Sequence, residues 1–233
     1  MIIACMCTFP ARGDLILPAI DSLYNQVDKI RLCLNEYTEI PSFLDKYEKL
    51  VAIIPDTDQR DVGKFLDIDA DDEDIILYVD DDIIYPENYA SVMCQKLTEN
   101  DKAVYGLHGV IYPDTYDGDV GLRRVFSFPR ALEKDRLVNQ IGTGTVAIKA
   151  KYRPKHSFMK GSQKFVDVRF AVHCFTHGIP IICIARGNNW LAEIKHGESI
   201  FSTFTKKWPL TVTMEVQTIA GYSKLNEPLT GSV

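Results

Sequence analysis

The sequence lacks any apolar run long enough to cross a membrane. No stretch of its 233 residues approaches the roughly 20 consecutive apolar residues that a membrane-spanning helix requires. Residues 1–10 also lack the basic segment that opens a secretory signal peptide, and Arg12 follows too soon for one. These absences lead us to expect a cytoplasmic protein without a transmembrane segment.

Paired cysteine motifs and internal repeats are also missing. The six cysteines include no Cys-x-x-Cys pair, and most of them lie inside apolar runs. We therefore expect free, buried thiols in a reducing compartment, with disulfide bonds as the alternative. The absence of repeats, low-complexity segments and a recognisable linker favours one domain over residues 1–233.

Acidic residues are concentrated in one part of the chain, although the net charge is only −6. Twelve acidic residues fall between Asp56 and Asp82, against two basic ones, Arg60 and Lys64. Acidity gathered in this way suits cation binding and argues against a nucleic-acid partner. The other basic residues are too dispersed to define a patch, so peripheral membrane association and oligomer formation both stay open.

Apolar runs alternate with helical patterns through the first hundred residues. Strands are predicted at residues 2–7, 29–34, 50–54 and 75–79, and helices at about residues 16–27, 43–47 and 87–100. This alternation is typical of an α/β protein with a mostly parallel sheet that is covered on both faces. The second half is less regular, with a strand predicted at 103–111, a helix at 166–177 and a strand at 181–184.

Polar residues lie at or near the carboxyl ends of the predicted strands, which is where ligands bind in sheets of this kind. These residues are Thr8, Asn35, Asp61 and Asp80. We expect them to line a single nucleotide-binding crevice.

Three consecutive aspartates, at residues 80–82, follow the predicted strand at 75–79 and precede a Pro-Glu-Asn turn. Three carboxylates at one strand end repel one another unless a cation lies between them. Oxygen ligands suit magnesium or manganese, and such an ion would also bridge phosphate oxygens. A solvated acidic turn is the alternative, but the strand before the aspartates and the turn after them favour a metal–nucleotide site.

Four segments follow one another in an order typical of a known enzyme family. They are Ala11-Arg12 followed by Ile20-x-Ser22-Leu23-x-x-Gln26, residues 78–86 with the three aspartates, Gly142-Thr143-Gly144-Thr145, and residues 167–170 followed by Gly178-Ile179-Pro180. Over residues 2–190 the chain thereby resembles the glycosyltransferase family 2-like enzymes, which have the GT-A fold. Two positions depart from the family pattern: Asn35-Glu36 stands where an aspartate is common, and Val166-Asp167 stands where Glu-Asp is common.

The resemblance implies a single GT-A-type domain with a Rossmann-like mixed, mostly parallel sheet and helices on both faces. About residues 1–100 would bind the nucleotide and the metal, and about residues 101–233 would bind the acceptor and carry the catalytic group. The implied reaction moves a sugar from a nucleotide-diphosphate donor, with a UDP-sugar favoured, to a hydroxyl of a glycan or lipid-linked saccharide acceptor, with inversion. Such an enzyme would serve polysaccharide biosynthesis.

The resemblance also implies residue roles. Asp167 would be the general base that takes the proton of the acceptor hydroxyl. Manganese or magnesium would be bound by Asp80, Asp82 and His196, and would neutralise the departing nucleotide diphosphate. The ribose hydroxyls are an alternative partner for Asp80. Residues expected to contact the nucleotide are Thr8, Phe9, Pro10, Arg12, Asn35, Asp61, Lys64, Asp80 and Asp81.

Two other functions stay open. A nucleotidyltransferase that makes a nucleotide sugar would normally carry a basic, Gly-rich loop after the first strand, and residues 7–12 lack one. A non-catalytic nucleotide- or sugar-binding domain would not need both the aspartate cluster and Asp167. Elsewhere, His173 and His177 have a zinc-compatible spacing without a further ligand, so surface or packing residues are the preferred interpretation. Trp190 and Trp208 are expected either to stack on an acceptor sugar or to pack in the core or at an interface.

Overall fold

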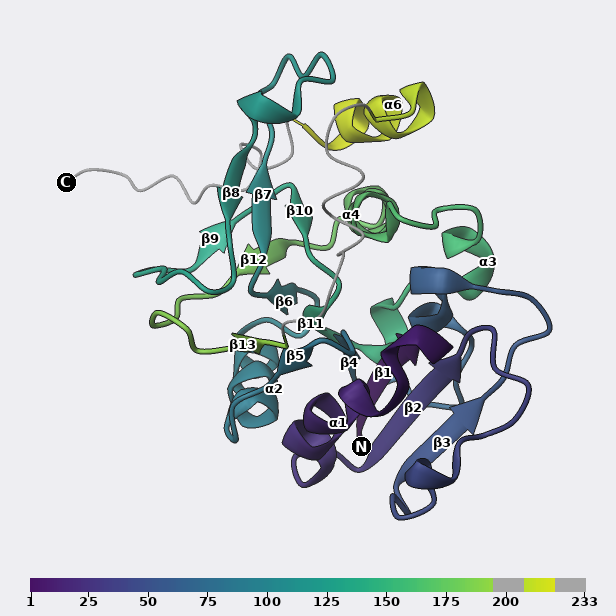
Figure 1. Ribbon diagram of the computed structural model, residues 1–233. Helices are drawn as coiled ribbons and strands as arrows, with labels where there is room; N and C mark the ends of the chain where they lie inside the picture. The colour runs from purple at the N-terminus through teal and green to yellow at the C-terminus, as the bar shows by residue number, and fades with distance from the viewer. Residues whose placement is uncertain (195–207, 221–233) are drawn as a thin grey trace.

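The centre of the fold is an eight-stranded sheet in the computed structural model, which describes residues 1–194 and 208–220 (Figure 1). The strand order is β3-β2-β1-β4-β11-β6-β12-β9. These strands are β1 (Ile2–Thr8), β2 (Lys29–Leu34), β3 (Leu50–Ile53), β4 (Ile75–Val79), β6 (Val104–Gly106), β9 (Arg136–Leu137), β11 (Thr145–Lys149) and β12 (Ile181–Cys183). The neighbours β3, β2, β1 and β4 run parallel, as do β6 and β12. The predicted mostly parallel sheet is confirmed.

Helices cover both faces of the sheet (Figure 1). The α-helices are α1 (Leu17–Tyr24), α2 (Tyr89–Glu99), α3 (His156–Met159), α4 (Val166–Thr176) and α6 (Leu210–Ile219), and the 3-10 helices are η1 (Pro10–Ile16), η2 (Ser42–Leu44), η3 (Arg60–Phe65), η4 (Val120–Leu122) and η5 (Ala150–Tyr152). The helices α1 and α2 share one core with Ala4 and Met6 of β1, whereas η3, α4 and α6 share the opposite core with Ile3 and Cys5. Both faces of β1 are buried, which fits its apolar sequence from residue 2 to residue 7.

Two small sheets complete the fold. One contains β10 (Gln140–Ile141), β7 (Gly109–Ile111) and β8 (Arg124–Phe126), and the other pairs β13 (Ala192–Glu193) with β5 (Ile83–Ile84). The first lies at the end of the molecule opposite β3 (Figure 1). The second joins the segment after the three aspartates to the segment that ends at residue 194.

Two predicted elements differ from the structure. The helix predicted at 43–47 is only the single turn η2, because its backbone bonds are successive turns from Asp45 N to Ser42 O and from Tyr47 N to Leu44 O. The strand predicted at 103–111 is two strands, β6 and β7, that belong to different sheets. Strand structure is interrupted at residues 107–108, where the chain passes from the large sheet to the small one.

The cysteines and histidines behave as structural residues. All six cysteines are free thiols, as predicted. The His173 and His177 rings lie 4.3 Å apart, and each ring has a backbone carbonyl partner, Tyr152 O at 2.8 Å and His173 O at 2.8 Å respectively. His173 is therefore a buried packing residue, whereas His177 lies at the surface. Within the described parts of the chain, none of the helices is both long and apolar enough to span a membrane.

Candidate functional site

The aspartate cluster begins where β4 ends, beside the end of β1. These parallel neighbours bring Thr8 next to Asp81, and the Thr8 hydroxyl donates to Asp81 Oδ2 at 2.7 Å. Both residues are buried. Burial raises the pKa of Asp81, while the Arg12 guanidinium and the Thr8 hydroxyl oppose that rise. The Asp81 side chain thus faces the protein and fixes the two strand ends to each other.

Arg12, from η1, neutralises two of the three carboxylates. Its Nη2 donates to Asp82 Oδ2 at 3.0 Å, and its Nε lies 3.5 Å from Asp81 Oδ2. The guanidinium carbon also lies 5.5 Å from the centre of the Phe9 ring, a cation–π distance. The Phe9 ring and the Arg12 guanidinium therefore pack together beside the aspartates, and nucleotide contact by Phe9, Pro10 and Arg12 stays a prediction.

Lys64 neutralises the third carboxylate. It extends from η3, and its ammonium donates to Asp80 Oδ1. The Lys64 side chain is 3% exposed and that of Asp80 is 40% exposed. Burial lowers the pKa of Lys64, but Asp80 and other nearby negative groups raise it by more, so the net shift is upward. Lys64 is therefore a buried cation whose partner reaches solvent.

The loop at residues 142–145 packs directly against Asp80. A Cβ atom at Gly144 would lie 1.9 Å from Asp80 Oδ2, so only glycine leaves room for this carboxylate. The Tyr85 hydroxyl donates to Gly144 O at 2.6 Å and accepts from Asp80 N at 2.8 Å. The aspartate cluster and the predicted acceptor-side loop are thus joined by one tyrosine that sequence reasoning did not single out.

Asp167 lies in the first turn of α4, on the other side of the same loop. Its Oδ1 accepts from both the backbone N and the hydroxyl of Thr143, at 2.8 and 2.7 Å. Burial raises the pKa of Asp167, and the two Thr143 bonds and Lys64 offset part of that rise. A half-buried carboxylate with a raised pKa is a stronger base than an exposed aspartate.

His108 is a residue of this site that the sequence analysis missed. It occupies the break between β6 and β7, and its carbonyl accepts from Gly142 N at 2.7 Å. Burial lowers the pKa of the His108 imidazole, whereas Asp167 raises it. The signal was present: a histidine between Gly106 and Gly109 interrupts an otherwise apolar run.

Asn35 and Asp61 hold loops beside the site. The Asn35 amide accepts from Gln59 N at 2.9 Å and donates to Arg60 O at 3.0 Å. Both oxygens of Asp61 accept from Lys164 N, at 2.9 and 2.8 Å. Lys164 has a left-handed φ of 72°, which is costly for a lysine, and the bifurcated hydrogen bond to Asp61 stabilises this conformation. Asp61 therefore connects η3 to the loop that leads into Asp167.

The carboxylate oxygens of this site suit a hard divalent cation whose remaining coordination positions would be filled by substrate phosphates. Within residues 1–194 and 208–220, no group of three or more His, Cys, Asp and Glu side chains converges on one point. Magnesium is commonly bound by one or two carboxylates plus substrate phosphates, and the carboxylates of Asp80 and Asp82 are ligands of that chemical type. Ile194 N donates to Asp82 O at 2.7 Å, but His196 lies outside the described residues.

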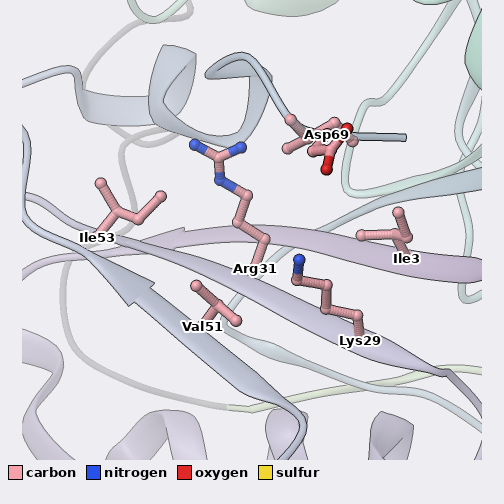
Figure 2. Close-up of a pocket in the computed structure, with 7 residues that line it drawn as sticks. Ile3, Lys29, Arg31, Val51, Ile53 and Asp69 are labelled. Atoms are coloured by element: carbon pink, nitrogen blue, oxygen red, sulfur yellow. The ribbon is translucent and has the colours of Figure 1, made fainter. Parts of the chain in front are cut away.

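A shallow cavity of about 150 Å³ lies elsewhere, on the sheet face beside β1, β2 and β3 (Figure 2). Lys29 and Arg31 extend into it from β2, beside Val51 and Ile53 of β3. Arg31 Nη1 donates to the carbonyl of Asp67, so this cation supports the loop above it. None of the predicted site residues lines this cavity.

Replacing Asp61 by asparagine is expected to change how stability depends on pH. Burial raises the pKa of Asp61 from 3.8 to about 6, with the Lys164 N–H bonds opposing the rise. The folded state therefore holds this proton more tightly than the unfolded state, and Asp61 lowers stability progressively as the pH rises from 3.8 to about 6. Urea denaturation of both proteins across this window should show a smaller fall for Asp61→Asn. Parallel curves would contradict the raised pKa.

Comparison with known proteins agrees with this architecture. No protein-family model and no curated protein matches the sequence. A solved structure described as GalNAc-T7 with UDP, GalNAc and Mn²⁺ superposes with a TM-score of 0.57 and 6% sequence identity, over 79% of this chain and 42% of that one. The chain therefore spans less than half the length of that protein. A likeness at such low identity shows the fold, and this chain has the mixed α/β GT-A fold.

Proposed function

We propose that this protein is a metal-dependent glycosyltransferase of the family 2-like type that uses a nucleotide-diphosphate sugar. The observation that carries the proposal is the juxtaposition of two carboxylate groups across one loop. Asp80 contacts that loop at Gly144, and Asp167 is bonded to its neighbour Thr143. A donor-side acidic cluster and a base candidate therefore face one site from two halves of the chain, about residues 1–100 and 101–233. The solved structure with UDP and Mn²⁺ adds support through the shared fold.

Donor binding is assigned to the strand ends of the first half. Phe9 offers an aromatic ring for the base, and Asp80 has the exposure to accept from ribose hydroxyls or bind the cation. Arg12 and Lys64 are the cations next to the aspartates, so they are the groups that would approach the diphosphate. Thr8, Asp81 and Asn35 support this surface from within, since their side chains are engaged with protein groups.

A bound magnesium or manganese ion would be held by Asp82 and Asp80, and would neutralise charge on the leaving nucleotide diphosphate. His196 stays a predicted third ligand. Asp82 shares Arg12 with Asp81, so binding a cation there would let the guanidinium turn toward phosphate oxygens. The chain thus carries its own positive charge where the diphosphate is expected.

Asp167 is assigned the role of general base. The acceptor hydroxyl is a poor nucleophile until a carboxylate within hydrogen-bond reach takes its proton. Thr143 fixes the Asp167 carboxylate through Oδ1, and its raised pKa makes it a better proton acceptor. Attack by the hydroxyl on the anomeric carbon, from the side opposite the departing diphosphate, would give inversion.

Binding of UDP is expected to depend strongly on manganese. Without the ion, the diphosphate would face the carboxylates of Asp80 and Asp82, and charge repulsion would weaken its binding. Calorimetric titration with manganese and with a chelator should give a much lower Kd in manganese. Asp82→Asn should remove that difference, while Asp72→Asn, in an exposed position of the same acidic region, should retain it.

Equal affinity in both conditions would overturn the metal-bridged site.

Product analysis separates the remaining alternatives. Incubation with a UDP-sugar, manganese and a sugar acceptor would release UDP from a glycosyltransferase. A nucleotidyltransferase would instead release pyrophosphate from UTP and a sugar phosphate. Tight binding without either product would indicate a non-catalytic domain.

A further inference from the structure

An aromatic cluster with one arginine lies next to the base candidate in the chain. The Trp208 ring lies 5.9 Å from Phe165, 6.4 Å from Tyr112 and 6.5 Å from Tyr116, measured between ring centres. The Arg123 guanidinium carbon lies 5.5 Å from the centre of the Trp208 ring. We call Arg123, Trp208, Tyr112, Tyr116 and Phe165 the arginine–aromatic cluster.

The cluster adjoins the catalytic region through the backbone. Phe165 precedes Asp167 by two residues at the start of α4. The Tyr112 hydroxyl donates to Gln140 Oε1 at 2.6 Å, and β10, which contains Gln140, leads into the loop at residues 142–145. A molecule whose hydroxyl reaches Asp167 would therefore have its neighbouring groups beside this cluster.

The cluster combines a cation with hydrogen-bond donors, and Asp117 and Asp119 of the neighbouring loop are the carboxylates that act on Tyr116. Within residues 1–194 and 208–220, Arg123 forms no ion pair with a carboxylate, and it contacts the Trp208 ring and the Tyr112 hydroxyl. Asp119 belongs to the same loop, but its carboxylate accepts from Gly121 N at 2.7 Å. The Tyr116 hydroxyl is buried and has no hydrogen-bond partner in that part of the chain.

A second guanidinium lies near His108. Arg186 lowers the pKa of the His108 imidazole through its positive charge. Its guanidinium donates to the carbonyls of residues 126, 127, 128 and 184 instead of to a carboxylate. Arg123 and Arg186 thus both lie near His108. Planar guanidinium donors match carboxylate and phosphate oxygens, and an aromatic face holds such a donor in one orientation.

We propose that the acceptor is an anionic saccharide, whose carboxylate or phosphate group binds Arg123 and the Tyr116 hydroxyl while a sugar ring stacks on the cluster. This inference rests on the proposed glycosyltransferase function and adds the acceptor class to it. The anion would supply the acceptor for an otherwise unbonded tyrosine hydroxyl and the counter-charge for Arg123. Its position would place a neighbouring sugar hydroxyl toward Asp167.

Ligand-observed NMR titrations in the presence of UDP and magnesium test the proposal with three probes. The probes are methyl glucuronide, methyl glucoside 6-phosphate and neutral methyl glucoside. We expect the wild type to bind at least one anionic probe about 10–100-fold more tightly than the neutral one, the range for hydrogen bonds to charged groups. The two anionic arms separate a carboxylate from a phosphate preference.

Variants locate the preference. Arg123→Gln should abolish it, Arg123→Lys should retain part of it, and Tyr116→Phe should weaken anion binding without loss of stability. Arg124→Gln is the matched control, because Arg124 is the exposed neighbour and stacks on Phe126 instead. Equal binding of charged and neutral probes by a wild type that binds UDP normally would overturn the anionic subsite alone. Anion preference that Arg123→Gln removes, in a protein that fails to bind UDP with metal, would support the subsite and overturn the proposed function.

Discussion

Replacement of Asp167 by asparagine is expected to reduce the rate of sugar transfer by about 10²–10⁴-fold, the usual contribution of a general base. Asparagine keeps the size of the side chain and can still accept from Thr143, so the fold and the UDP affinity should remain. Single-turnover measurements with saturating donor would isolate the chemical step. Transfer at a near-normal rate would show that the base is another residue.

The pH profile gives this prediction a second readout. The base must be deprotonated to act, and burial raises the pKa of Asp167. The wild-type kcat/KM should therefore fall as the pH drops through that raised pKa, and the residual activity of Asp167→Asn should lack this limb. Asp45→Asn, which removes an exposed carboxylate that is distant from Asp167 in the sequence, should leave both the rate and the pH profile unchanged.

Replacement of Asp80 by asparagine is expected to be strongly destabilising, even though Asp80 reaches solvent. Its partner Lys64 is 3% exposed, so the variant leaves a buried ammonium without its carboxylate. Breaking a fully buried ion pair by removing one partner costs about 3–5 kcal/mol, and solvent around the 40%-exposed Asp80 should reduce that cost here. Chemical denaturation at neutral pH and without donor would measure the loss.

The reverse change should be far milder, and this asymmetry is the test. Lys64→Met removes the buried charge and leaves Asp80 able to contact water, so its cost should be small. The double variant Lys64→Met/Asp80→Asn should be more stable than Asp80→Asn alone, giving a coupling energy in the double-mutant cycle. All three proteins should lose UDP binding. Equal destabilisation by the two single changes would contradict the burial argument.

The sequence predicted the parts of the site that depend on buried strands. The strands β1 and β4 could be recognised from their apolar runs because both faces of these strands are covered. Their parallel pairing brings Thr8 beside the aspartates at the carboxyl ends. The location of Asp167 followed from a resemblance, and the Thr143 bonds place it beside the same loop.

Contacts between loops could not be read in the same way. The Arg12 and Lys64 ion pairs depend on how η1 and η3 approach the end of β4, which no periodicity encodes. His108 was hidden because the sequence reads as one strand where the chain in fact passes between two sheets. The predicted helix at 43–47 failed for a related reason: three apolar residues mark a buried turn as readily as a helix.

On the ribosome, β4 would be complete well before its second neighbour exists. Its partner β11 ends at residue 149, whereas β4 ends at residue 79, so at about 5–20 residues per second roughly 4–14 s of synthesis separate them. During that interval the nascent chain exposes the unpaired edge of an Ile-Ile-Leu-Tyr-Val strand, a composition that favours aggregation. Acidic residues at 71–74 and 80–82 flank the strand on both sides. They would act as gatekeepers for the growing polypeptide before any of them serves the folded protein.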